Sequence, residues 1–204
     1  MSTGICAVVV SYHPDGQLVA NVSSLLPQID ELLVVDNGSG PGSNAVLEAL
    51  AALPNVRLVR HSYNLGIAAA LNVGARYALE KSYPWLATFD QDSFAPQGFI
   101  ASLRESYDKC PYRERVAIVA PRFREKDSEP EFIRSYVRRR EHSDYSRIDV
   151  TMTSGNLVRT EVFRTVGWFD EPLFIDYVDH EFCMRVRKLG WYVIEASNAI
   201  LDHS

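Results

Sequence analysis

Short apolar runs alternate with amphipathic helical patterns over the first 120 residues of the chain. The runs are rich in Val, Ile and aromatic residues, as buried parallel strands are, and they lie at Ile5–Tyr12, Glu31–Asp36, Val56–His61, Trp85–Asp90 and Val116–Pro121. Helical patterns between them cover residues 16–26, 43–53, 66–81 and 96–109. This alternation predicts an α/β fold with a mostly parallel central sheet, right-handed crossovers and helices on both faces.

The alternation stops at residues 122–149, which are rich in charge and include Arg138, Arg139 and Arg140. Such a segment is typical of a solvated loop, and a dedicated anion site is the alternative. Beyond it, the pattern predicts further elements in the order strand, helix, helix, strand. They lie at Thr151–Val158, Thr160–Val166, Val178–Leu189 and Trp191–Ala196.

Composition narrows the class of protein. The chain has 204 residues, 47% of them hydrophobic and 23% charged, which is ordinary for a folded protein with one substantial core. Its net charge of −5 gives no support for nucleic-acid binding, which requires a basic excess. Cys6, Cys110 and Cys183 are scattered, so we expect small buried hydrophobic residues in a reducing cytosol. No apolar run reaches the roughly 18 residues that span a bilayer.

An Asp-Gln-Asp sequence directly follows the apolar run Trp85–Phe89. Ligands of α/β proteins collect at the carboxyl ends of strands, where these residues would lie. Asp90 and Asp92 are separated by one residue, so they can share a hard cation such as Mg²⁺ or Mn²⁺. Such a cation keeps positions open for phosphate or sugar oxygens. The alternative is that the pair only caps the next helix.

Polar residues also end the earlier strands. Ser11 ends the first predicted strand and Asp36 the second, and neighbouring strand ends should converge on one crevice. Asp36 can accept a hydrogen bond from a ribose hydroxyl or a base N–H. Asn64 and Gly66 precede a helix rich in small residues, which allows close approach of a ring, although helix–sheet packing explains those residues equally well.

Two later segments carry candidate chemistry. Ser154, Gly155 and Asn156 interrupt a predicted strand in a way that suits close backbone approach to a polyhydroxylated ligand. The segment Phe169–Glu181 places five carboxylates and one imidazole around a helix start. Asp179 lies in the first helical turn, where the helix dipole favours an ionised carboxylate that can take a proton from an alcohol. The alternative is complementation of the dipole without chemistry.

Taken in order, six motifs carry a resemblance that covers nearly the whole chain. They are Val9–Tyr12, Val34–Ser39, Asn64–Gly66, Asp90–Ser93, Ser154–Asn156 and Asp176–Glu181. Their order resembles the family 2 glycosyltransferases of the GT-A fold, in particular the rhamnosyltransferase-like branch that builds bacterial surface polysaccharides. The resemblance implies an inverting transferase that moves a sugar, such as rhamnose, from a nucleotide-diphosphate donor to a hydroxyl of a saccharide or lipid-linked saccharide.

The resemblance also implies roles for individual residues. Asp36 would contact the nucleoside, and Asp92 would bind the metal ion that bridges the diphosphate, with Asp90 beside it toward the sugar. Asp179 matches the family's catalytic aspartate, which deprotonates the acceptor hydroxyl. Glu181 lies at the second acidic position of that motif, and Asp176 is a further candidate.

One departure concerns the acidic motif, and one further candidate lies near the end of the chain. Val178 stands where many relatives carry Glu, which is why Asp176 is considered. Related enzymes often place a C-terminal His at the metal or diphosphate, so His203 is a candidate second metal ligand. Ser11, Asn64, Gly66 and the motif Ser154–Asn156 are expected at the nucleotide-sugar site.

We expect one GT-A-like catalytic domain over residues 1–204, with a nucleotide-binding half at 1–120 and an acceptor-binding, catalytic half at 121–204. Members of the family continue well past such a position, so we expect a truncated C-terminus that lacks part of the acceptor site. The expected location is cytoplasmic, with peripheral association at the inner face of the membrane through that missing region.

Three rival functions are weighed against this one. A haloacid-dehalogenase-type phosphatase places its Asp-x-Asp after the first strand, whereas here the pair follows the fourth. A Rossmann dinucleotide-binding protein needs a Gly-x-Gly-x-x-Gly turn, which does not follow Ser11. A non-catalytic nucleotide-sugar-binding relative is the third, and the presence of Asp90, Asp92 and Asp179 argues against it.

Overall fold

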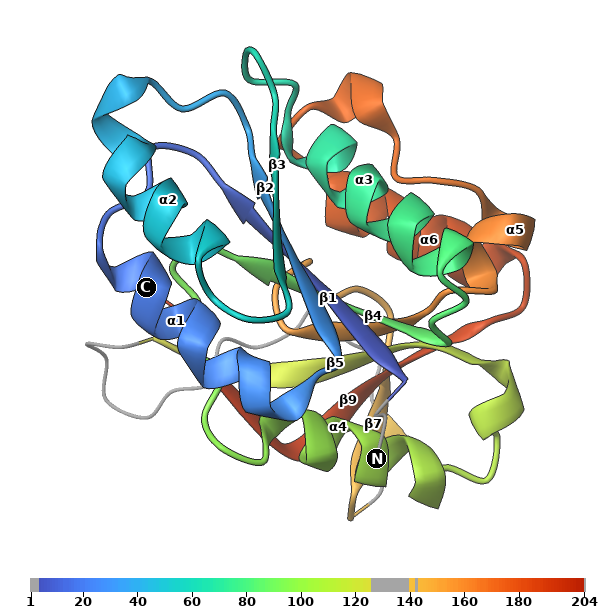
Figure 1. Ribbon diagram of the computed structural model, residues 1–204. Coiled ribbons are helices and arrows are strands. Elements are labelled where there is room, and N and C mark those ends of the chain that lie inside the picture. The colour runs from blue at the N-terminus through green and yellow to red at the C-terminus, as the bar shows by residue number, and fades with distance from the viewer. Residues whose placement is uncertain (1–3, 126–139, 142, 204) are drawn as a thin grey trace.

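The chain forms a central sheet with helices on both faces (Figure 1), and the computed structural model describes residues 4–125, 140–141 and 143–203. The strands are β1 Ile5–Ser11, β2 Glu31–Asp36, β3 Val56–Arg60, β4 Trp85–Asp90, β5 Val116–Glu125, β6 Arg140–Glu141, β7 Tyr145–Ile148, β8 Asn156–Arg159 and β9 Tyr192–His203. The helices are α1 Gln17–Leu25, α2 Asn44–Ala51, α3 Ile67–Glu80, α4 Phe99–Lys109, α5 Val162–Val166 and α6 Val178–Lys188. No helix in this part of the chain is long and apolar enough to cross a bilayer.

The strands lie in the order β3-β2-β1-β4-β8-β5-β9-β7-β6. Strands β3, β2, β1 and β4 pair in parallel, and β9 is parallel to β5. Among the described strands only β8 and β7 run against the others, because β8 is antiparallel to β4 and β5, and β7 to β9 and β6. This confirms the predicted α/β fold with a mostly parallel sheet.

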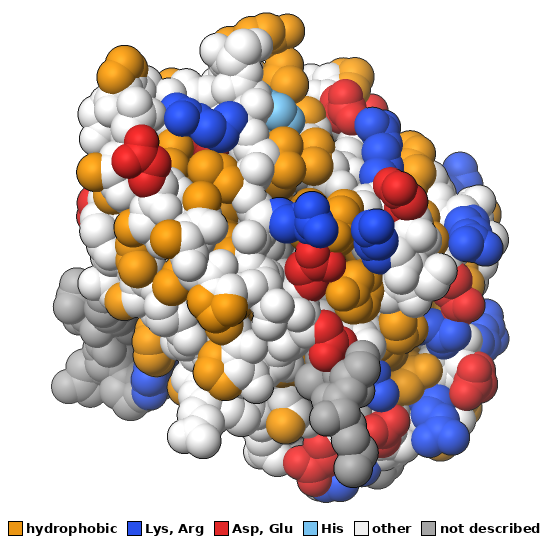
Figure 2. Space-filling model, in the orientation of Figure 1, with side chains coloured by type: hydrophobic (Ala, Val, Ile, Leu, Met, Phe, Trp, Pro, Cys, Tyr) orange, Lys and Arg blue, Asp and Glu red, His pale blue; other side chains and the backbone are white. Residues whose placement is uncertain are grey.

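Side chains alternate between two cores along each central strand, as the pleat requires. In β1, Ile5, Ala7 and Val9 face the core beneath α1, α2 and α4, whereas Cys6 and Val8 face the core beneath α3, α5 and α6. Both faces of the sheet are therefore buried, which explains why the strands are continuous apolar runs. On the face shown in Figure 2, side chains of both charge signs are interspersed and do not form a single patch.

The prediction of a loop over residues 122–149 is wrong in part. Strand β5 continues to Glu125, and β6 and β7 form within the segment, with Tyr145 and Ile148 buried. Strand β7 is too short to give a periodic signal, and its pairing with β9 supplies the backbone hydrogen bonds that stabilise it. Arg138 and Arg139 lie outside the described residues.

Two other strand boundaries also differ from the prediction. The strand predicted from Thr151 begins only at Asn156, since Gly155 has a φ of +76° that a strand does not accommodate. The last strand was expected to end at Ala196, yet β9 continues to His203. A register shift against β5 around Ala120 and Arg122 lets β9 resume pairing at Ile200 beyond the polar Ser197 and Asn198.

Candidate functional site

Three of the predicted polar residues lie at the carboxyl ends of adjacent strands. On β1, Ser11 is paired with Asp36 of β2, and Val10 is paired with Asp90 of β4. Strand β1 therefore lies between the two carboxylates, and the structure confirms that Asp36 and the Asp90–Asp92 pair do not lie on opposite edges of the sheet. In Figure 1 the carboxyl ends of β1 and β2 lie toward the upper left of the view.

Asp36 is fully buried and only partly paired. Its Oδ2 accepts a hydrogen bond from the Ser39 N–H (3.2 Å) and lies 3.7 Å from Nε of the half-exposed Arg60. Its Oδ1 and the hydroxyl of Ser11 are buried without a hydrogen-bond partner among the described residues. A buried oxygen left without a donor costs about 1–3 kcal/mol, so this pair fits a ligand that brings its own donors.

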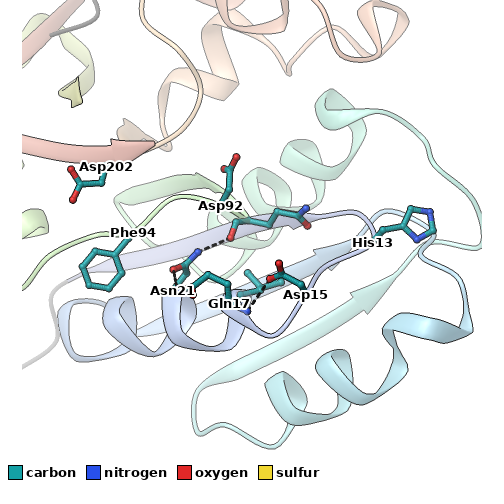
Figure 3. A pocket seen from close by; sticks show the side chains of 9 residues that line it. His13, Asp15, Gln17, Asn21, Asp92, Phe94 and Asp202 are labelled. Carbon is teal, nitrogen blue, oxygen red and sulfur yellow. Dashed lines mark hydrogen bonds between the residues drawn. The ribbon is translucent and has the colours of Figure 1, made fainter. Parts of the chain in front are cut away.

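The turn that carries Asp90 and Asp92 is fastened to β1 and α1 through Gln91. The Gln91 side chain accepts from the Tyr12 N–H (2.9 Å) and donates to the Tyr12 carbonyl (3.1 Å). The Asn21 side chain on α1 donates to the Gln91 carbonyl (2.8 Å), a contact drawn in Figure 3. Asp92 itself is exposed, so the turn holds a carboxylate at the surface.

A cavity of about 600 Å³ lies between this turn and the start of α1. It is lined by His13, Asp15, Gln17, Leu18, Asn21, Gln91, Asp92, Phe94 and Asp202. In Figure 3, Asp92 lies between His13 on one side and Phe94 with Asp202 on the other. Ser11 and Asp36 do not line this cavity, because they are buried at the neighbouring strand ends.

The end of β9 reaches the Asp-x-Asp turn. The Phe94 N–H donates to the Asp202 carbonyl (3.3 Å), and the Asp202 carboxylate pairs with Arg124 of β5 (2.6 Å). His203 ends β9 next to Asp202, and its side chain lies outside the described part of the structure. Sequence reasoning missed Asp202, Asn21 and Gln91, and only Gln91 carried a signal, since it lies within the motif.

The donor atoms at the cavity suit a hard divalent cation. Asp92 and Asp202 offer carboxylate oxygens, which Mg²⁺ and Mn²⁺ prefer. Within residues 4–125, 140–141 and 143–203, no three carboxylate, imidazole or thiol groups come together as a complete metal site. A metal held here would thus complete its coordination with substrate oxygens or water, as Mg²⁺ does at phosphate sites.

Ser154, Gly155 and Asn156 brace the turn from inside the fold. Ser154 is fully buried, accepts a hydrogen bond from the Asp90 N–H (3.1 Å) and bonds the Ser93 hydroxyl (2.8 Å). A Cβ at Gly155 would lie 2.7 Å from Leu201. The buried Asn156 side chain donates to the Met152 carbonyl. These contacts explain Ser154 and Gly155 by packing, whereas Oδ1 of Asn156 is buried without a hydrogen-bond partner among the described residues. Contact of the three residues with a sugar stays a prediction.

Asn64 and Gly66 connect the ends of the parallel strands to the acidic segment, Phe169–Glu181. Asn64 Oδ1 accepts from the Asn37 side chain (2.8 Å) and from the Gly66 N–H (2.9 Å). Gly66 has a φ of +87°, and a Cβ there would lie 2.5 Å from the Phe174 carbonyl oxygen. That same oxygen accepts from the Ile67 N–H (2.7 Å). Gly66 thus allows the Phe174 segment to lie against the start of α3.

The acidic segment contains two strained residues. Phe174 and Tyr177 have φ values of +58° and +62°, which bulky non-glycine residues rarely adopt. They flank the exposed Asp176. Asp179 lies in the first turn of α6 with its side chain 22% exposed, and its Oδ1 accepts from the His180 N–H (2.7 Å) and ring Nδ1 (2.8 Å).

Glu181 makes a structural ion pair. Arg185 donates to both of its carboxylate oxygens, at 2.8 and 2.6 Å, and also to the carbonyls of Val166 and Trp168. This pairing ties α6 to the chain that follows α5, and it occupies the carboxylate of Glu181. Of the three candidate bases named from the sequence, Asp176 and Asp179 are left to meet a substrate.

The cysteines are buried thiols, as predicted. Burial raises the pKa of Cys6 and of Cys183 to about 12, and nearby carboxylates add to the effect. Because the thiolate is the reactive form, these two residues are not nucleophiles.

The fold is that of the GT-A glycosyltransferases. The structure superposes on GalNAc-T7 with UDP, GalNAc and Mn²⁺ with a TM-score of 0.79 at 14% identity, over 98% of this chain and 43% of that one. It superposes on S. aureus TarS 1–349 with a TM-score of 0.74 at 17% identity, over 98% and 59%. At these identities the likeness shows the fold.

The family follows from the sequence. Residues 6–167 match the model of Glycosyl transferase family 2, and the chain belongs to that family. It is 34% identical to the dTDP-rhamnosyl transferase RfbF of Shigella flexneri, over 100% of this chain and 72% of the relative. It is 26% identical to an N-acetylglucosaminyl-diphospho-decaprenol L-rhamnosyltransferase of Mycobacterium tuberculosis, over 100% and 76%. The chain is a glycosyltransferase, and these comparisons favour none of the three rival functions.

Proposed function

We propose that this glycosyltransferase moves L-rhamnose from a dTDP-linked donor to a hydroxyl of a saccharide or lipid-linked saccharide, with inversion at the anomeric carbon. One observation carries the proposal. The unpartnered oxygens of Ser11 and Asp36 lie at the ends of β1 and β2, beside the end of β4, whose following turn presents Asp92 to the cavity. The names of the Shigella and mycobacterial relatives support the donor and the class of acceptor.

The nucleoside belongs at Asp36 in this proposal. Thymine carries an imide N–H, which is the donor that the unpartnered Oδ1 of Asp36 lacks. The Ser11 hydroxyl on the adjacent strand can bond a ribose oxygen. Arg60 and the Ser39 N–H already meet the other carboxylate oxygen, so the donor would complete the pairing of a buried charge.

The diphosphate belongs at the Asp-x-Asp turn. Asp92, with Asp90 beside it and His203 as a further candidate, would hold Mg²⁺ or Mn²⁺. When bound, the ion offsets the negative charge that develops on the departing diphosphate. The turn is rigid for this task because Gln91 and Ser154 fix its backbone from two sides.

Asp179 is the proposed general base. Its carboxylate would take the proton of the acceptor hydroxyl, whose oxygen attacks the anomeric carbon from the face opposite the diphosphate. Asp176 lies nearby in the same segment and is the alternative base, whereas Glu181 is engaged by Arg185. The proposed halves of the domain are 1–120 for the donor and 121–204 for the acceptor and catalysis, and Ser154 and Asp202 of the second half also contact the Asp-x-Asp turn.

Exposed hydrophobic side chains around the acidic segment support an acceptor surface there. Tyr63, Phe174, Ile175 and Tyr177 are each 45–71% exposed. In Figure 2, hydrophobic side chains project at the top of the view, where the β3–α3 connection lies. Aromatic rings suit the apolar face of an acceptor sugar. A lipid-linked acceptor would also bring the enzyme to a membrane surface, as the predicted peripheral association requires.

Asp92→Ala tests the donor site. Asp92 is exposed, so its removal leaves the fold intact, and we expect Mn²⁺-dependent affinity for dTDP to fall at least about 10-fold. Asp15→Ala is the control, because Asp15 lines the same cavity from outside the turn. Calorimetric titration with and without Mn²⁺ measures both. Equal wild-type affinity in the two conditions, or unchanged binding by Asp92→Ala, would refute the assignment.

A further inference from the structure

The imidazole of His180 lies against the carboxylate of its neighbour in the chain. Asp179 Oδ1 accepts both the backbone N–H of His180 (2.7 Å) and its ring Nδ1 (2.8 Å), while Oδ2 has no hydrogen bond within the described residues. We infer that His180 is a positioning residue, which holds the Asp179 carboxylate so that Oδ2 is presented to the acceptor hydroxyl. The inference rests on the general-base role proposed for Asp179.

The chemistry of the two groups fixes where the ring proton lies. A carboxylate only accepts hydrogen bonds, so Nδ1 of His180 must carry a hydrogen to approach Oδ1 at 2.8 Å. The neutral ring is then the Nδ1–H tautomer, with Nε2 as an acceptor. The contact thus requires one ring tautomer, and a spectroscopic measurement can detect it.

The surrounding turn limits rotation of the imidazole. Tyr177, which has a left-handed backbone conformation just before α6, packs edge-on against the His180 ring with centroids 5.8 Å apart. The side chains of Asp179 and His180 are 22% and 41% exposed, so both remain open to a substrate. Glu181 is turned to Arg185 and does not compete for the ring. The carboxylate is therefore held by groups from its own helical turn.

The transfer step uses only Oδ2. The acceptor proton passes to Oδ2 of Asp179 as the acceptor oxygen forms its bond to the anomeric carbon. The bond from that carbon to the diphosphate oxygen breaks, and its electron pair leaves with the nucleoside diphosphate. His180 is unchanged by the reaction, so its loss should lower turnover without weakening donor binding. A base displaced by about 1 Å can cost about 100-fold in rate.

Three substitutions distinguish the effect of losing the Nδ1 hydrogen bond from the effect of losing the imidazole ring itself. His180→Asn places an amide N–H near the position of Nδ1, His180→Gln places it nearer Nε2, and His180→Leu has none. With dTDP-L-rhamnose, Mn²⁺ and water as the acceptor, we expect kcat for dTDP release to fall about 10- to 100-fold in the Gln and Leu variants. His180→Asn should keep most of the activity, and KM for the donor should stay within about 2-fold throughout. Met184→Ala, an exposed change on the same helix, is the control.

The Asp179→Asn background distinguishes the inference from the proposed function. If His180 acts through Asp179, His180→Leu lowers dTDP release in the wild type and adds no further loss to Asp179→Asn. If His180→Leu releases dTDP at the wild-type rate, or lowers the rate by the same factor in both backgrounds, the inference alone is overturned. Full release by Asp179→Asn overturns the base assignment and the inference together.

A measurement without turnover gives an independent test. The nitrogen-15 shifts of the His180 ring in the free enzyme should report the Nδ1–H tautomer, and Asp179→Asn should reduce its population. An Nε2–H ring in the wild type overturns the inference whatever the activity. Absence of dTDP release by the wild type would contradict the proposed donor, and the tautomer would still decide the role of His180.

Discussion

Replacement of Gly66 by Ala should weaken the contact between the start of α3 and the segment that leads to Asp179. At Gly66 the chain has φ +87° and ψ 162°, a conformation that is close to glycine-only. A Cβ there would lie 2.5 Å from the Phe174 carbonyl oxygen and 2.8 Å from the Phe174 Cα. Both contacts are with backbone, so a side-chain rotation cannot relieve them.

The expected cost can be built from three effects. Backbone strain at such a φ and ψ costs about 1–3 kcal/mol, and the hydrogen bond from the Ile67 N–H to the Phe174 carbonyl, which the clash would lengthen, is worth about 1 kcal/mol. The lower entropy of the unfolded alanine chain returns about 0.4–1 kcal/mol. We expect Gly66→Ala to lower the free energy of unfolding by about 2–3 kcal/mol, which is roughly 4–12 °C in Tm for a chain of this size.

Gly98→Ala is the matched control. Gly98 also has a positive φ, +81°, and also precedes a helix, but a Cβ there meets nothing within 4 Å. Its cost should be about 1 kcal/mol, from strain alone. Thermal unfolding of both variants isolates the clash at Phe174. In turnover assays Gly66→Ala should lose kcat and keep donor affinity, and equal Tm values for the two variants would refute the reasoning.

Two further predictions concern the pH dependence of stability and the Asp-x-Asp turn. Burial alone would raise the pKa of Glu31, but hydrogen bonds from Arg57, Tyr77 and Tyr83 outweigh it and hold the pKa below its usual value. A lowered pKa stabilises the fold above the unfolded value of about 4.3 and ceases to do so as the pH falls through the folded value. Glu31→Gln should therefore cost about 1 kcal/mol at pH 7 and progressively less as the pH falls below about 4.3, as urea unfolding measures; a cost that does not change with pH would contradict this. Ser154→Ala removes two buried hydrogen bonds to the Asp-x-Asp turn, so it should cost about 1–3 kcal/mol and weaken Mn²⁺-dependent dTDP binding severalfold; unchanged calorimetric affinity would exclude a bracing role.

The central strands could be predicted from the sequence because both faces of the sheet are covered. Their apolar runs are continuous, and the predicted bounds of β2 and β4 are those observed. The end of the last strand could not be predicted, because the polar residues Ser197 and Asn198 are typical of a strand end although β9 continues beyond them. Where these residues stand, pairing with β5 is interrupted, and β9 then resumes at Ile200. Long-range pairing of this kind leaves no local pattern.

The candidate site likewise contains residues that the sequence predicts and residues that only long-range contacts bring together. Topology alone brings Ser11, Asp36 and Asp90 together, because parallel strands end at one edge of the sheet. Asp202 and Asn21 reach the cavity through contacts between distant segments, which periodicity does not report. The sequence analysis selected Glu181 because it is a carboxylate in the acidic motif. Arg185, four residues later on the same helix, was the sequence signal that Glu181 forms an ion pair.

Two backbone hydrogen bonds between segments far apart in the chain complete the candidate site. The bond from Ile67 to Phe174 holds the acidic segment at the start of α3, and the bond from Phe94 to Asp202 holds the end of β9 at the Asp-x-Asp turn. The nucleoside side needs neither bond, because the parallel strands β1 and β2 already align Ser11 and Asp36. Loss of the Ile67 bond should therefore leave nucleotide binding in place and lower turnover, whereas loss of the Phe94 bond should also weaken metal-dependent binding of the diphosphate. Donor binding and catalysis thus depend on different parts of the same sheet, and the connection at Gly66 is where the two parts meet.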